Sequence, residues 1–138
     1  MAGTQALKQR QMEGQMQGQM KTAIILFAHG SRDAQWREPI EAVALQISRR
    51  QPEARVRCAY LEICAPTLPE AAADLIADGA QRIKVFPLCL GVGKHAREDL
   101  PLLVEQLRAA YPGVTVELLP AAGEYPQLTG VLADIALS

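Results

Sequence analysis

Apolar and polar positions follow two periods along the chain, and these periods divide residues 22–138 into strand-like and helix-like segments. Strands appear as short apolar runs or as strict alternation, whereas helices repeat apolar residues every three or four positions. The first pattern predicts four strands, at residues 22–28, 55–62, 83–90 and 114–119. The second predicts four helices, at about 34–50, 66–78, 100–111 and 128–135.

Each predicted strand is followed by a predicted helix over a short link. Such β–α units imply a mostly parallel sheet with helices on both faces. Segments 22–28 and 83–90 are almost continuously apolar, as in strands covered on both sides, whereas 55–62 alternates like an edge strand. We therefore expect residues 22–138 to form a single flavodoxin-like α/β domain with strand order 2-1-3-4.

Both histidines of the chain follow predicted central strands. His29 comes directly after the first, in AIILFAHGSRD, and His95 follows the third, in FPLCLGVGKHAREDLP. Between that strand and His95, Gly91 and Gly93 allow the backbone to bend without a Cβ penalty. Glu62 ends the second strand. Because ligands of open α/β sheets bind at the carboxyl ends of the strands, we expect these three side chains to face one cleft.

Two imidazoles and a carboxylate suggest transient metal binding. Neutral imidazole suits cobalt, nickel, iron or zinc, and two protein ligands leave coordination positions free for exchange. A closed structural zinc site needs four ligands, which the sequence does not assemble. Taken singly, each histidine is nearly as well explained as a surface or capping residue.

Other motif interpretations compete for the same segments. Residues 91–96 match G-x-G-x-x-[GA], so an anion could sit at the next helix N-terminus, but no acidic residue clearly occupies the ribose-binding position. Leu88 and His95 stand where a P-loop needs glycine and Ser/Thr, and Ala28 stands where an R-H-G phosphohistidine enzyme has arginine. A metallochaperone or sensor and an anion- or nucleotide-binding flavodoxin-like protein remain as alternatives.

Composition restricts the partners and the location. The length of 138 residues, with 49% hydrophobic residues, suits one domain, and the net charge of −1 indicates neither nucleic-acid nor membrane binding. We expect a cytoplasmic protein. Its three cysteines, Cys58, Cys64 and Cys89, lack CxxC spacing and are expected to be free thiols. Residues 1–21 hold all four methionines and six glutamines, and this polar tail is predicted to be disordered.

Three motifs in this order resemble the small, single-domain sirohydrochlorin chelatases. They are AHGSRD, the E-x-x-x-P-x-L-x-E-A run that begins at Glu62, and FPLCLGVGKHAREDLP, and the resemblance extends over residues 22–137. These proteins are class II chelatases of cobalamin and sirohaem synthesis, related to ferrochelatase. The resemblance implies insertion of a divalent metal into a tetrapyrrole without an organic cofactor. The metal is a substrate, cobalt or iron, with nickel a further candidate.

The resemblance also implies roles for particular residues. His29 and His95 correspond to the two active-site histidines of the family, as metal ligands and proton acceptors, and Glu62 to an acidic position that assists them. Sirohydrochlorin carries many carboxylates, and the candidates to hold them are Ser31, Arg32, Gly93, Lys94 and Arg97. Most ferrochelatase relatives use two such domains facing each other, so a symmetric homodimer is expected.

Overall fold

The structure is a computed structural model, and it describes residues 21–138. The strands in this range are β1 (Thr22–Ala28), β2 (Arg55–Tyr60), β3 (Arg82–Pro87) and β4 (Thr115–Leu118). The helices are α2 (Ala34–Arg50), α3 (Leu68–Ala77), α4 (Lys94–Ala110) and α5 (Pro126–Leu137), with a short 3-10 helix, η1 (Ala122–Glu124), before α5. None of the helices described is both long and apolar enough to cross a bilayer. The predicted tail lies outside the described residues, apart from Lys21.

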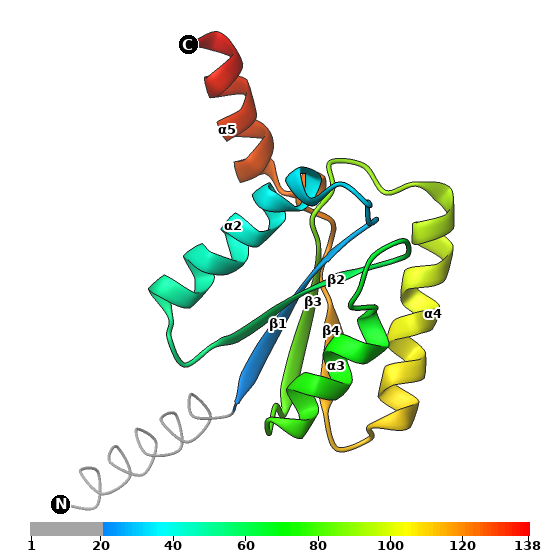
Figure 1. The fold of residues 1–138 in the computed structure, drawn as a ribbon. Coiled ribbons are helices and arrows are strands. Elements are labelled where there is room, and N and C mark those ends of the chain that lie inside the picture. Colours follow the sequence, from blue (N-terminus) through cyan, green and yellow to red (C-terminus); the bar gives the residue numbers. More distant parts are fainter. Residues whose placement is uncertain (1–20) are drawn as a thin grey trace, which may run out of the picture.

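The strands form one parallel sheet in the order β2-β1-β3-β4, which confirms the predicted fold and strand order. Helices α3 and α4 cover one face and α2 lies on the other (Figure 1). Alternate residues of β1 serve the two sides: Ile25 and Phe27 join the large core under α3 and α4, and Leu26 joins a smaller cluster under α2. Strands buried on both faces need such continuous apolar runs.

Local hydrogen bonds explain where the first two helices begin. Asp33 caps α2, because its Oδ1 accepts an N–H of the first turn at 2.9 Å. The hydroxyl of Ser31 accepts the N–H of Asp33 at 3.1 Å. Thr67 caps α3 by accepting the N–H of Glu70, whose carboxylate accepts the Thr67 hydroxyl in return at 3.0 Å.

Strands β2 and β3 end earlier than the sequence predicts, at Tyr60 and Pro87 instead of residues 62 and 90. Both pair with β1, which itself ends at Ala28, so residues farther along have no complete strand beside them. The apolar run after Pro87 therefore continues as a loop. This loop carries the glycines that precede His95.

Helix α5 lacks the packing expected of a final helix in this fold. Its apolar positions are as predicted, yet none of its residues is buried. It projects beyond the carboxyl edge of the sheet on the side of α2 (Figure 1). Helix α2 is also thinly packed, because Ile40 is its one buried residue and Trp36 and Val43 are exposed.

Candidate active site

A polar side-chain contact at the carboxyl edge of the sheet joins the first histidine to the carboxylate after β2. Nε2 of His29 lies 3.0 Å from Oε1 of Glu62, and the two side chains are 61% and 58% exposed. With a proton on Nε2, His29 donates a hydrogen bond to the carboxylate. Two ligands about 2.1 Å from one metal ion and at right angles to each other would also be about 3.0 Å apart. The spacing therefore suits either a proton or a metal ion between these atoms.

Backbone pairing beyond the strand ends holds these two residues together. The N–H of Leu61 donates to the carbonyl of Ala28 at 3.0 Å, and the N–H of Glu62 donates to the carbonyl of His29 at 3.1 Å. Gly30 makes this approach possible: its φ is 114°, and a Cβ on it would lie 2.0 Å from the carbonyl oxygen of Glu62. Only glycine fits there without displacing the Glu62 segment.

The backbone just after Glu62 is itself strained. Ile63 has φ of 75°, a value that β-branched residues rarely adopt, and the N–H of Cys64 donates to the carbonyl of Glu62 at 2.8 Å. A hydrogen bond that spans one residue in this way closes a tight γ-turn. Since the Ile63 side chain is 58% exposed, core packing does not impose this conformation. The turn fixes the direction in which Glu62 leaves the sheet.

His95 lies on a different element from the other two candidates. It is the second residue of α4, exposed, directly after the loop that leaves β3. His29 lines a small apolar pocket of about 130 Å³ together with Gly91 and Gly93 of that loop, whereas His95 does not line it. The structure thus brings the loop that carries His95 to His29. It brings the carboxylate of Glu62, and not the second imidazole, into contact with His29.

Contact with η1 anchors the loop before His95. The N–H of Gly123 donates to the carbonyl of Cys89 at 3.0 Å. A Cβ on Gly123 would lie 1.7 Å from the carbonyl oxygen of Leu90, so this glycine is required for the close contact. No local sequence pattern reveals that Gly30 and Gly123 are required, because each contacts a carbonyl group distant along the chain.

Gly91 and Gly93, in the loop between β3 and α4, are free of such constraints. Neither has a positive φ, and a Cβ on either would meet nothing within 4 Å. The chain does bend at Leu90 and Gly91, but a residue with a Cβ would also fit at both glycines, so the bend does not require them. Their lack of side chains instead leaves open space beside the pocket that His29 lines.

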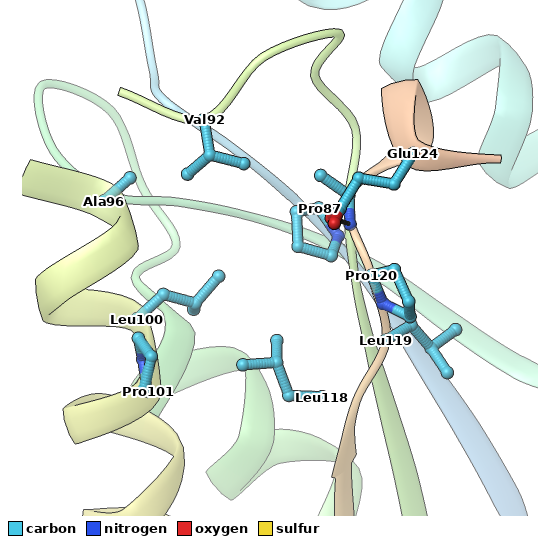
Figure 2. Close-up of a pocket in the computed structure, with 10 residues that line it drawn as sticks. Pro87, Val92, Ala96, Leu100, Pro101, Leu118, Leu119, Pro120 and Glu124 are labelled. Atoms are coloured by element: carbon cyan, nitrogen blue, oxygen red, sulfur yellow. Dashed lines mark hydrogen bonds between the residues drawn. The ribbon is translucent and has the colours of Figure 1, made fainter. Parts of the chain in front are cut away.

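A second apolar cleft adjoins this pocket. It has a volume of about 280 Å³ and shares Pro87, Val92, Ala96 and Leu100 with the pocket that contains His29. Figure 2 shows side chains of α4 on one side and those at the end of β4 on the other. Glu124 stands at its rim, where its carboxylate accepts the N–H of Ala121 at 2.8 Å. The two hollows together give the carboxyl edge an extended, mainly apolar floor.

The cationic candidates surround this floor and remain available to a ligand. Arg32, Lys94 and Arg97 are exposed, and none forms an ion pair with a carboxylate in residues 21–138. No side chain within that range caps the first turn of α4, whose N-cap is Gly93. Backbone N–H groups there are thus also open to an anion. Ser31 is half-buried and holds the turn before α2.

Burial raises the pKa of two thiols and one phenol in the described chain. The three cysteines are free thiols, as predicted. Burial raises the pKa of the Cys89 thiol, with Glu124 adding to the effect, and burial likewise raises the pKa of Cys58. Burial also raises the pKa of Tyr60 to about 12, and the Tyr60 ring packs against Trp36 at a centroid distance of 6.2 Å. Trp36 therefore packs at the rim of the cluster under α2.

Among residues 21–138, no group of three or more His, Cys, Asp or Glu side chains is arranged to hold a metal ion. The pair formed by His29 and Glu62 supplies two donors. An incomplete donor set suits an ion that passes through the site more than one that stays there. A parallel α/β domain with such a pair above an apolar floor has the architecture of a class II chelatase.

Comparisons with known proteins agree with this class. Residues 23–136 match the CbiX family model, so the chain belongs to the CbiX family. A sirohydrochlorin cobaltochelatase of Saccharolobus islandicus is 32% identical over 102 residues, which are 71% of this chain and 78% of that protein. A sirohydrochlorin cobaltochelatase of Methanococcoides burtonii is 31% identical over 85 residues, 62% of this chain and 65% of the relative.

Two solved structures are also similar to this chain, one matched over nearly its whole length and the other over about half of it. A CbiX protein from Marinobacter aquaeolei is 35% identical with a TM-score of 0.71, and the match covers 83% of this chain and 93% of that one. The sirohydrochlorin chelatase SirB from Bacillus subtilis subspecies spizizenii, in complex with cobalt, is 25% identical with a TM-score of 0.69. That match covers 85% of this chain but only 52% of the SirB chain. The present chain thus corresponds to about half of SirB.

Proposed function

We propose that this protein is a sirohydrochlorin metal chelatase, which inserts a divalent ion into the macrocycle in cobalamin or sirohaem biosynthesis. The observation that carries the proposal is the contact between His29 and Glu62 above an apolar floor, in a chain of the CbiX family. Cobalt and iron are the proposed metals and nickel is a further candidate, because imidazole and carboxylate ligands suit all three. The reaction needs no organic cofactor, since neither redox change nor group transfer takes place.

The proposed reaction requires metal binding, proton removal and binding of the macrocycle. His29 and Glu62 are proposed to carry out the first two. A hydrated ion must exchange some of its water for protein ligands, and Nε2 of His29 with Oε1 of Glu62 can take two adjacent positions. Two pyrrole N–H protons must then leave the macrocycle. Imidazole accepts protons near neutral pH, and a carboxylate 3.0 Å away stabilises the imidazolium that forms. His95 is proposed as a further metal ligand or proton acceptor.

Binding of the macrocycle is the third requirement. The flat, apolar ring would lie on the floor lined by Pro87, Val92 and Leu100. Its peripheral carboxylates would meet Arg32, Lys94 and Arg97, together with Ser31 and the open backbone N–H groups after Gly93. Because these cations lack partners in the described chain, no ion pair there has to break before the substrate binds.

A homodimer in the cytoplasm is part of the proposal. Sites for drug-sized ligands usually have volumes of about 300–1,000 Å³. The pocket beside His29 and the adjoining cleft measure about 130 and 280 Å³, and a tetrapyrrole is larger than most drug-sized ligands. A second copy facing the carboxyl edge would enclose the remaining surface of the macrocycle.

The test is a metallation assay with purified protein, sirohydrochlorin and Co²⁺ or Fe²⁺, followed by absorbance. We expect wild-type protein to accelerate metallation above the spontaneous rate. His29→Ala and His95→Ala should each lower the rate about 100-fold or more, because each removes a ligand or a proton acceptor. Both side chains are exposed, so circular dichroism should show an intact fold. A protein that binds the metal without accelerating metallation would instead be a metallochaperone or sensor.

A further inference from the structure

Ile63 combines two unfavourable features next to the pair formed by His29 and Glu62. Its φ is 75°, and the N–H of Cys64 donates to the carbonyl of Glu62 at 2.8 Å, which together describe the rare and strained form of the γ-turn. This conformation is costly for a β-branched residue. The side chain is also 58% exposed, so burial within this chain returns little of that cost.

The chain on either side of Ile63 is held in place. Before it, the N–H of Glu62 donates to the carbonyl of His29 at 3.1 Å. After it, the Cys64 side chain packs against the cluster under α2. The single residue between these two anchored parts therefore takes the strained conformation.

The position of Glu62 explains the turn at residue 63 but not the isoleucine. Glycine adopts a positive φ at no steric cost and would close the same turn, as Gly30 does nearby with φ of 114°. Exposed apolar side chains are common and by themselves indicate nothing. Here, however, an exposed apolar side chain stands where the backbone favours a residue without one. The isoleucine therefore points to a contact outside the single chain.

The place of Ile63 in the site identifies that contact. Leu61 and His29 line the same pocket, and Glu62 contacts His29. Ile63 directly follows these residues. Neighbouring Cα atoms are about 3.8 Å apart, and a tetrapyrrole is several times wider than this distance. A ring placed over His29 and Glu62 for metallation would thus reach Ile63 as well.

We propose that Ile63 is a substrate-binding residue, whose side chain packs against the flat apolar face of the macrocycle beside His29 and Glu62. The inference rests on the proposed chelatase function and adds a residue that binds the ring without binding the metal. Burial of the exposed side chain on the ring offsets the conformational cost of the turn. Because the turn is anchored on both sides, little freedom is lost when the ring binds.

Titration with sirohydrochlorin in the absence of metal, followed by absorbance, tests the inference directly. Ile63→Ala keeps a Cβ but removes the apolar contact, and its Kd for sirohydrochlorin should rise about tenfold. Ile63→Val, which lacks one methylene group, should stay within about threefold of wild type. Leu102→Ala is the matched control, because Leu102 is 61% exposed on α4 and lines neither hollow, and it should bind as wild type. A wild-type Kd in Ile63→Ala would overturn the inference.

Metallation kinetics separate this role from an effect on the metal pair. In Ile63→Ala the KM for sirohydrochlorin should rise and the KM for the metal should not. The reverse result would mean that Ile63 acts through Glu62, and it would overturn the inference. Loss of self-association in Ile63→Ala, measured by sedimentation equilibrium, would assign the side chain to a contact between copies, with the same consequence. Binding of sirohydrochlorin that depends on Ile63, without accelerated metallation, would refute the chelatase proposal alone.

Thermal unfolding tests the strain at Ile63. Ile63→Gly should raise the midpoint by about 4 °C, because glycine adopts this φ freely. Its Kd for sirohydrochlorin should nevertheless rise at least about tenfold, as in Ile63→Ala. A purely structural role would not combine greater stability with weaker binding of the macrocycle. A midpoint below that of wild type in Ile63→Gly would contradict the strain on which the inference depends.

Discussion

His29 and Glu62 are joined twice, once through their backbones and once through their side chains. The N–H of Glu62 donates to the carbonyl of His29 at 3.1 Å, and Nε2 of His29 lies 3.0 Å from Oε1 of Glu62. The backbone bond extends the pairing of β1 with β2 past the ends of both strands. The imidazole and the carboxylate therefore keep their relative position although both are exposed to solvent.

Substitution of the carboxylate should affect metal binding more than folding. Glu62→Gln keeps the size of the side chain and the backbone bond but removes the negative charge. We expect the KM for the metal to rise about 10- to 100-fold, with the midpoint of thermal unfolding unchanged. Glu53→Gln, an exposed site at the opposite edge of the sheet, is the control and should behave as wild type. If Glu62→Gln keeps the wild-type KM for the metal, Glu62 is not part of the metal site.

Gly30 should be among the least replaceable residues of the chain. Gly30→Ala combines an unfavourable φ of 114° with a Cβ 2.0 Å from the Glu62 carbonyl oxygen. We expect the free energy of unfolding to fall by more than about 2 kcal/mol in urea denaturation. Gly113→Ala, where a Cβ meets nothing within 4 Å and φ is not positive, should change it by less than about 1 kcal/mol. Equal effects of the two substitutions would contradict this account.

Gly123 should influence catalysis although it lies outside the cleft that His29 lines. In Gly123→Ala the new Cβ would lie 1.7 Å from the Leu90 carbonyl oxygen, so the loop before His95 must shift. A displacement near 1 Å can lower a rate about 100-fold, and we expect the metallation rate to fall at least about tenfold. The rate should fall even where urea denaturation shows the protein fully folded. An unchanged rate would mean that the position of this loop is unimportant.

The raised pKa of Tyr60 predicts that the folded protein loses stability at high pH. Burial raises its pKa from 10 to about 12, so the folded state favours the neutral phenol. The resulting stabilisation is fully present below pH 10 and is lost as the pH rises from 10 through 12. A shift of this size corresponds to at most about 3 kcal/mol. Urea denaturation between pH 9 and 12 should show a steeper fall for wild type than for Tyr60→Phe. Parallel pH profiles would contradict the prediction.

Hydrophobic periodicity predicted the sheet well because burial on one or two faces leaves a direct pattern. The central strands 22–28 and 83–90 are almost continuously apolar, and this predicts their place between two helical layers. Periodicity gave the position of α5 but not its exposure. An apolar stripe has the same form whether it packs on its own domain or on another chain.

Hydrophobic periodicity and topology predicted less of the candidate active site than of the sheet. The topology placed His29 and Glu62 at one edge, and the structure brings them into contact. Gly30 and Gly123 are required by carbonyl groups that only the folded chain brings near, and no local pattern reveals such contacts. The roles of both histidines, and of the cations around the cleft, remain predictions.

The two ends of the described chain leave the sheet in opposite directions (Figure 1). Lys21 enters β1 at the amino edge, whereas Ser138 follows α5, which extends past the carboxyl edge. An affinity tag or reporter attached ahead of Lys21 would leave the cleft accessible to a bulky macrocycle. The same label after Ser138 would follow a helix that extends past the carboxyl edge, so immobilised versions of this protein should be anchored by the first end.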